Sequence, residues 1–138
     1  MKTDENREKA KRFLQIWGDG DLSIIDDLAD PGIEVTYPIL PRKVRGSRLF
    51  RRIMEGFRSS FPDSKVRLEE TVAEGDSVAV RWTFTGTHSG PLLKYRASGV
   101  KVTWTGMTIY HFRDGRIVRE TGEEDFLGFL RQIGEIDE

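Results

Sequence analysis

The residues best suited to acid–base chemistry lie near the end of the sequence. His111 closes an alternating segment within "IYHFRDG" (residues 109–115), and Asp125 follows in the acid-rich stretch "EED", where an apolar helical pattern begins. An imidazole and a carboxylate can exchange protons with a substrate when both reach it. Each also has an ordinary structural explanation, Asp125 as a helix N-cap and His111 as a packed strand residue. The sequence leaves both interpretations open.

The alternation around His111 predicts which residues share its strand face. His111 lies on the same face as Met107 and Ile109, because side chains of a strand alternate between the two faces. If that face lines a cavity, the residues on the opposite face of the strand point outward. This outward row is too apolar to remain exposed to water, which predicts a homodimer that buries it. The members of that row are Trp104, Thr108, Tyr110 and Phe112.

The turn at Asp114-Gly115 decides how the return strand pairs with His111. A two-residue loop pairs His111 with Val118, whereas a three-residue loop with Gly115 in the left-handed conformation pairs it with Ile117. We favour the longer loop, which places Arg119 and Thr121 on the His111 face.

The sequence gives no sign of a metal or cofactor. The chain has no cysteine and only two histidines, His88 and His111, without the spacing of a metal site. It contains no GxSxG, P-loop or GxGxxG string. His88 falls in the loop "GTHSGPLLKYRASG", where it either covers a cavity mouth or is simply solvated.

Composition limits the protein class. The 138 residues suit one domain spanning residues 1–138. A net charge of −1 argues against nucleic-acid or anionic-membrane binding. No apolar run reaches the roughly 18 residues of a membrane span, and the polar start "MKTDENREKAKRF" does not resemble a signal peptide. We therefore expect a cytoplasmic protein.

Hydrophobic periodicity predicts the order of the elements. Helical spacing covers residues 4–17, 22–28 and 47–61, and strand alternation dominates residues 64–122. A last helix covers residues 125–134 and ends at Gly134. Helices first, then an antiparallel sheet, then a terminal helix indicate an α+β fold. We expect the curved sheet and its helices to form a cone with an internal cavity.

Several strings together resemble a known family. They are "FPD" at 61–63, "GDSVAVRWTFTGTHSG" at 75–90, "IYHFRDGRIV" at 109–118, and Asp125 with "GFLRQIG". In this order they resemble the SnoaL-like polyketide cyclases and ester cyclases, of the nuclear-transport-factor-like cone fold. The resemblance implies a cofactor-free enzyme that closes a ring by intramolecular aldol condensation. It assigns proton abstraction to Asp125 and support of the developing oxyanion to His111.

The resemblance also implies a small, hydrophobic, polyketide-like ligand. A tryptophan is common in the family four residues before the aspartate, where this chain has Thr121, so we expect a wider pocket. The alternatives are a non-catalytic ligand-binding domain, or a hydrolase, isomerase or hydroxylase that uses the same pocket. The residues expected to bind the substrate are Phe13, Trp17, Trp82, His88, Met107, Ile109 and Thr121.

Overall fold

The computed structural model describes residues 2–137, which form a six-stranded sheet covered by helices. The strand order across the sheet is β2-β1-β6-β5-β4-β3. The elements in chain order are α1 (Lys2–Leu14), the 3-10 turn η1 (Gln15–Trp17), α2 (Ile24–Leu28), β1 (Ala29–Thr36), β2 (Val44–Arg45), α3 (Ser47–Ser60), β3 (Lys65–Glu74), β4 (Ser77–Thr87), β5 (Lys101–Arg113), β6 (Arg116–Glu124) and α4 (Phe126–Gln132).

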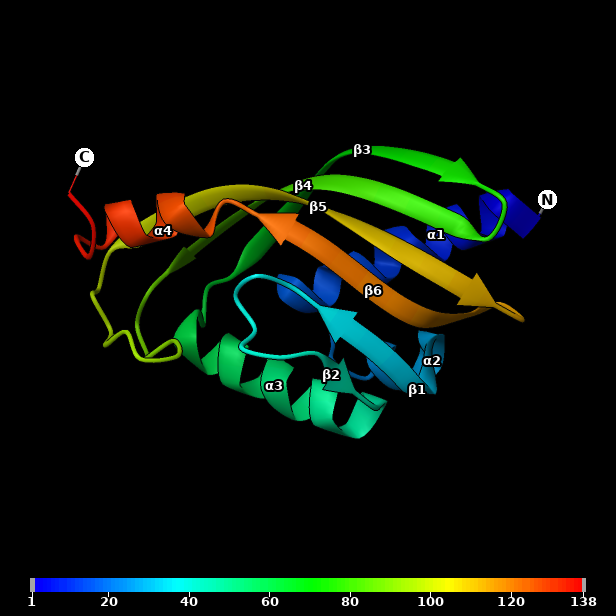
Figure 1. Cartoon of the computed structure of the whole chain (residues 1–138), viewed down its shortest axis with the longest axis horizontal. Helices are drawn as coiled ribbons and strands as arrows, with labels where there is room; N and C mark the ends of the chain where they lie inside the picture. Colours follow the sequence, from blue (N-terminus) through cyan, green and yellow to red (C-terminus); the bar gives the residue numbers. More distant parts are fainter. Residues whose placement is uncertain (1, 138) are drawn as a thin grey trace.

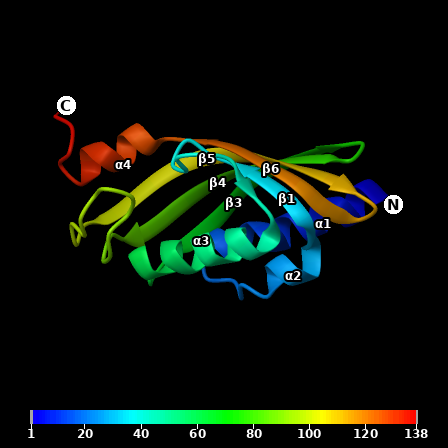
Figure 2. The same cartoon turned by 60° about the horizontal axis from the view of Figure 1, so that its bottom comes forward.

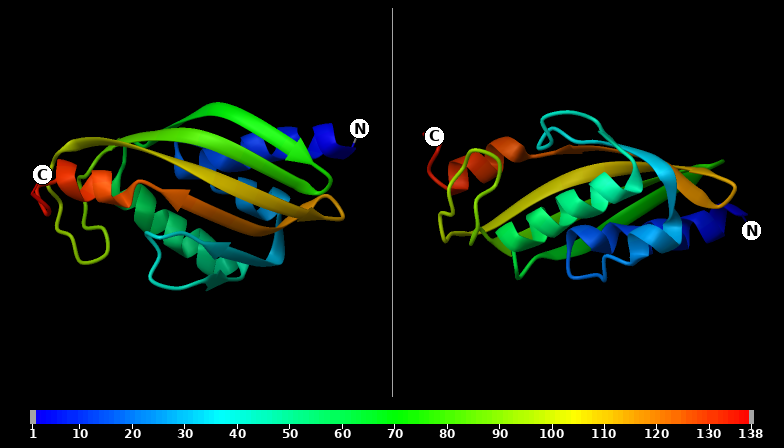
Figure 3. Two further views of the ribbon diagram at one scale, coloured as in Figure 1. Left: turned by 45° about the horizontal axis from the view of Figure 1, so that its top comes forward. Right: turned by 90° about the horizontal axis from the view of Figure 1, so that it is seen from below.

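The helices lie on one face of the curved sheet. Figure 1 shows α1 behind the strands, and Figure 2 shows α1, α2 and α3 below the sheet, with α4 extending the end of β6. Figure 3 shows the opposite sheet face without a helix over it. The predicted α+β cone fold is confirmed. One detail differs from the expected antiparallel sheet, because β1 pairs with β6 in parallel.

The helices pack through the apolar stripes that the sequence predicts. Phe13 of α1 is fully buried, with its ring centroid 6.3 Å from that of Phe50 on α3 and 5.8 Å from that of Tyr110 on β5. A helix buries such a stripe because its apolar residues recur every three to four positions. No helix within residues 2–137 combines the length and apolarity that a bilayer crossing requires.

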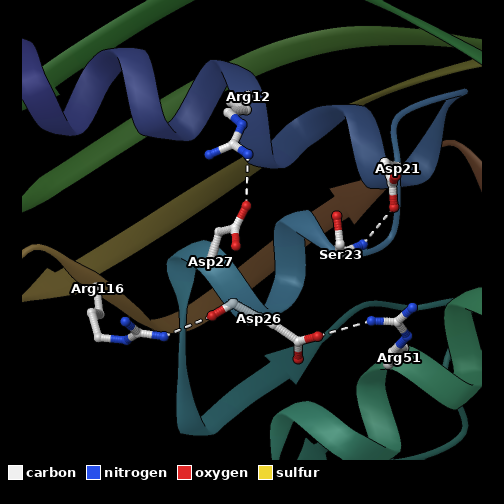
Figure 4. A network of polar contacts seen from close by, with 7 residues as sticks. All are labelled: Arg12, Asp21, Ser23, Asp26, Asp27, Arg51 and Arg116. Atoms are coloured by element: carbon white, nitrogen blue, oxygen red, sulfur yellow. Dashed lines mark hydrogen bonds and ion pairs between the residues drawn. The ribbon is translucent and has the colours of Figure 1, made fainter.

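The short helix α2 is tied to its neighbours by charged side chains (Figure 4). Asp27 accepts a hydrogen bond from Arg12 of α1 at 2.7 Å, and Asp26 accepts one from Arg51 of α3 at 2.9 Å. Arg116 of β6 donates to the backbone oxygen of Asp26 at 2.9 Å. Exposed pairs of this kind contribute up to about 1 kcal/mol each. Together they fix α2 against three elements.

The turn between β5 and β6 differs from the sequence prediction. Asp114 and Gly115 both have positive φ, 51° and 77°, and form the two-residue loop typical of tight hairpins. The predicted three-residue loop is therefore wrong. A β-bulge then shifts the register, so that His111 lies opposite Arg119. Arg119 and Thr121 therefore lie on the His111 face, as expected, but the cause is the bulge and not a three-residue loop.

The predicted orientation of β5 is also wrong. Met107 and Ile109 are 52% and 42% exposed, and they lie with His111 on the helix-free face. The opposite row faces the helices because its rings complete the core, as the edge-on contact of Tyr110 with Phe13 shows. The proposed dimer surface is thus inside the protein, and the homodimer remains a prediction without that basis. The buried row is Trp104, Thr108, Tyr110 and Phe112.

Candidate functional site

Two glycines of the sheet make room for aromatic rings on the sheet face that the helices cover. Gly106 of β5 lies opposite Trp82 of β4, and a Cβ at Gly106 would overlap the Trp82 ring. On β6, a Cβ at Gly122 would overlap the ring of Tyr37. Both rings therefore lie close against the sheet, because glycine leaves space that any other residue would fill.

This packing brings polar atoms together inside the core. Trp82 Nε1 donates to Thr108 Oγ1 at 3.0 Å, and the Tyr37 hydroxyl lies 2.8 Å from the same oxygen. Tyr37 donates to Glu120 Oε2 at 2.5 Å, and Trp17 Nε1 donates to that oxygen at 2.8 Å. Since Tyr37 uses its proton on Glu120, the Thr108 hydroxyl donates to Tyr37. The hydrogen bonds thus form a directed chain that ends on one carboxyl oxygen.

Glu120 is completely buried, and its environment disfavours the charge. Burial raises the pKa of Glu120 to about 7, although the hydrogen bonds from Tyr37 and Trp17 act in the opposite direction. Its second oxygen, Oε1, has no hydrogen-bond partner among the described residues, and neither has the hydroxyl of Tyr110. Tyr110 lies directly opposite Glu120 on β5. An unpaired buried oxygen of this kind is expensive when ionised.

A second carboxyl, Glu124, borders a narrow, largely apolar chamber at the end of β6. The chamber has a volume of about 20 Å³, enough for one water molecule. Burial, and then the neighbouring charge of Glu123, raise the pKa of Glu124 to about 8. Its Oε1 has no hydrogen-bond partner within residues 2–137. The rings that line the chamber are Trp17, Tyr37, Phe57, Trp82, Phe84 and Trp104.

An open groove adjoins the chamber. It lies between α3 and the loop of residues 88–100, and its volume is about 270 Å³. Trp17, Ile39 and Phe57 line both spaces, so they form the partition between groove and chamber. Ile39 lies in the loop of residues 37–43, where Leu40 N donates to Tyr37 O at 3.0 Å. A ligand in the groove therefore contacts the wall of the chamber that holds Glu124.

We expect Gly122→Ala to destabilise the protein by about 1–3 kcal/mol, the usual cost of overpacking a core. The new methyl group would displace the Tyr37 ring and break its bond to Glu120. Urea unfolding measures the change. Gly56→Ala is the matched control, because Gly56 is an exposed residue of α3 with no atom within 4 Å of an added Cβ. It should be neutral or stabilising, and equal losses in both variants would contradict the prediction.

The structure does not bring His111 and Asp125 together. His111 lies opposite Ser77 and Arg119, and its Nδ1 is 3.2 Å from Ser77 Oγ. Asp125 is at the other end of the sheet, where its backbone N–H donates to Thr105 O at 2.9 Å. Six residues of β5 separate the two positions, about 20 Å along a strand. The predicted convergence in the cavity is wrong.

Asp125 and His111 each have a structural environment of their own. Asp125 is exposed and caps α4, since its Oδ1 accepts from Gly128 N at 2.9 Å. His111 borders a shallow polar groove on the helix-free face with Arg113 and Arg119. Burial, and then the charge of Arg119, lower the pKa of His111.

The expected substrate-binding residues separate into three groups. Trp17 and Trp82 line the chamber, as predicted for a cavity. Phe13 and His88 are fully buried and do not line it; the His88 Nδ1 lies 2.9 Å from Ser98 Oγ, and its ring stacks on Phe61. The third group lies on the helix-free face, so Thr121 cannot widen the pocket. This group is Met107, Ile109 and Thr121.

The carboxyls that face inward were not predicted from the sequence. Glu120, Gly122 and Glu124 alternate along β6, so they share one face. That alternation was readable, but charged residues are usually exposed, and the His111 face was expected to be the inward one. Within residues 2–137, His, Asp and Glu side chains form no group of three suited to a metal ion.

Comparisons with known proteins agree with this fold. The profile of the SnoaL-like polyketide cyclase family matches residues 8–133, and a comparison with curated proteins finds no match. TsrD from Streptomyces laurentii is 28% identical with a TM-score of 0.84, over 96% of this chain and 97% of that chain.

Two further solved structures are similar over nearly the whole chain. A protein from Jannaschia sp. CCS1, assigned as a SnoaL-like polyketide cyclase, is 25% identical with a TM-score of 0.88, over 97% of this chain and 94% of that one. AclR from Streptomyces galilaeus, proposed to be a hydroxylase, is 26% identical with a TM-score of 0.83, over 99% and 89%. The family profile covers nearly all of the chain, and the chain therefore belongs to the SnoaL-like polyketide cyclase family.

Proposed function

We propose that this protein is a cofactor-independent cyclase that acts on a small, apolar polyketide-like ester, with Glu124 as its acid–base group. The observation that supports this most is the position of the Glu124 carboxyl. It faces an apolar chamber, one of its oxygens lacks a partner within residues 2–137, and its pKa is raised to about 8. A carboxylate is ordinarily too weak a base to remove a proton from carbon, and burial strengthens it.

The reaction requires a carbon acid that lies between two carbonyl groups. Ionised Glu124 removes the proton from this carbon, and the resulting enolate attacks a second carbonyl of the same molecule. The new carbon–carbon bond leaves an alkoxide, to which the protonated Glu124 returns the proton. The apolar rings around Glu124 leave room for about one water molecule at most, which strengthens electrostatic interactions and limits competing hydrolysis.

Solvent-deuterium exchange tests the first step. Incubation in D2O with 1,3-dicarbonyl esters should give protein-dependent exchange at the central carbon. Mass spectrometry measures the incorporated deuterium. Exchange no faster with the protein than without it, for every ester of a panel that binds, would favour the non-catalytic ligand-binding alternative and overturn the cyclase proposal.

A hydrolase is the second candidate, and the chamber volume favours it. A space of about 20 Å³ holds one water molecule beside Glu124. A carboxylate base could activate that water toward an ester lying in the groove. The same incubations distinguish the two reactions, because hydrolysis releases the free acid whereas cyclisation retains the ester.

A further inference from the structure

We infer that the groove beside the chamber binds the apolar body of the substrate, an alkyl chain or ring system, and that Leu93 is a specificity-determining contact. The orientation of the reactive end toward Glu124 rests on the proposed function. Binding of the apolar body does not, because the groove exists independently of any turnover.

The two spaces differ in what they can hold. The chamber, at about 20 Å³, accommodates a reactive group at most, whereas the groove, at about 270 Å³, approaches the size of ordinary ligand pockets. Trp17, Ile39 and Phe57 border both. A molecule with a small polar end and a larger apolar body therefore fits this arrangement, with the polar end in the chamber and the apolar body in the groove.

Leu93 borders the groove in an unusual backbone conformation. Leu92 and Tyr95 exchange two backbone hydrogen bonds, both 2.9 Å, and close a two-residue turn at Leu93 and Lys94. Leu93 has a φ of 52°, a position normally occupied by glycine in such turns. Its side chain is 51% exposed. A strained backbone that presents an apolar side chain to a groove indicates a binding role.

The surroundings of the turn hold Leu93 in place. Ser60 of α3 donates from Oγ to Pro91 O at 2.6 Å, and Ser60 O accepts from Gly90 N at 3.2 Å. On the other side, the Tyr95 ring lies 6.2 Å from that of Phe126 on α4. The turn is thus anchored to two helices, and its tip is directed at the groove. This anchoring explains how the strained conformation persists.

Calorimetric titration of the full chain with 2-alkanones, from butanone to 2-decanone, tests the inference without requiring turnover. For the wild type, affinity should rise about fourfold for each added methylene that enters the groove. Leu93→Ala should bind 2-decanone about tenfold more weakly and butanone equally well. Leu93→Gly should lose affinity in the same way, yet unfold at a temperature no lower than Leu93→Ala, because glycine relieves the backbone strain.

Leu49→Ala is the matched control, since Leu49 is 45% exposed on α3 and does not line the groove. It should bind every ketone as the wild type does. Affinity independent of chain length in the wild type, or equal affinities in Leu93→Ala and Leu49→Ala, would overturn the inference. Chain-length dependence without deuterium exchange would remove the cyclase proposal alone, and exchange without chain-length dependence would remove this inference alone.

Discussion

Glu124→Gln should lower the rate of deuterium exchange and of turnover by about 10²–10⁴-fold, the usual contribution of one acid–base group. Glutamine keeps the shape of the side chain and cannot accept a proton. The variant should remain folded, because the substitution removes a carboxyl whose charge is disfavoured by burial. Circular dichroism and thermal unfolding establish that the loss is chemical.

The pH dependence of the rate gives an independent measure of the same group. A base must be ionised, so turnover should rise with pH and level off above the Glu124 pKa of about 8. The charge of Glu123 is part of what raises this pKa, so Glu123→Gln should shift the midpoint to lower pH. It should leave the maximal rate unchanged.

Asp125→Ala is the contrasting variant. Asp125 caps α4 by accepting a hydrogen bond from Gly128 N, so its loss should reduce the free energy of unfolding by about 1 kcal/mol. Turnover should be preserved, because the Asp125 side chain is exposed. An active Glu124→Gln protein, or an inactive but folded Asp125→Ala protein, would refute the assignment of Glu124.

Glu120→Gln should make the protein more stable at pH 8 and leave its stability unchanged at pH 4. Glu120 has an ordinary pKa of 4.5 and a folded-state pKa of about 7. A raised pKa means that its contribution is fully present below about 4.5 and is lost as pH rises to about 7. The shift corresponds to roughly 3 kcal/mol. Glutamine retains an oxygen for Trp17 and Tyr37 and introduces no charge.

Urea unfolding between pH 4 and pH 9 measures this difference. The wild type should lose stability through the window from 4.5 to 8, since Glu124 contributes with the same sign. Glu120→Gln should retain only the Glu124 part of that slope. Glu55→Gln, at an exposed site on α3, should follow the wild type. Identical pH slopes for Glu120→Gln and the wild type would contradict the prediction.

Hydrophobic periodicity predicted the helices and the long strands, but neither the short strand β2 nor the inward face of β5. The pattern places Met107 and Ile109 on one face and Tyr110 and Phe112 on the other, and both faces are apolar enough to be buried. Which face is buried depends on tertiary packing, because the larger rings fill the space between the sheet and helices α1 and α3. A period of two gives two faces without identifying which one meets the core.

The site was harder to predict than the fold because its parts come from distant segments. Tyr37 lies in a loop outside the strings that resemble the family, and its hydroxyl donates to Glu120, 83 residues later. The membership of the two faces of β6 was predicted correctly, but the face that carries Glu120 and Glu124 was expected to point away from the cavity. Asp125, by contrast, was conspicuous because it opens a helix, and its capping role explains that position.

The pairing of Gly122 and Gly106 with aromatic rings determines how the interior volume can change among proteins with this scaffold. Tyr37 over Gly122 and Trp82 over Gly106 occupy volume that the backbone itself leaves vacant. A descendant that shortens either ring while keeping its glycine enlarges the interior without moving a strand. A descendant that replaces the glycine must give up the ring. Interior volume can therefore evolve in discrete steps at two positions, although a change at Tyr37 also removes a hydrogen bond from Glu120.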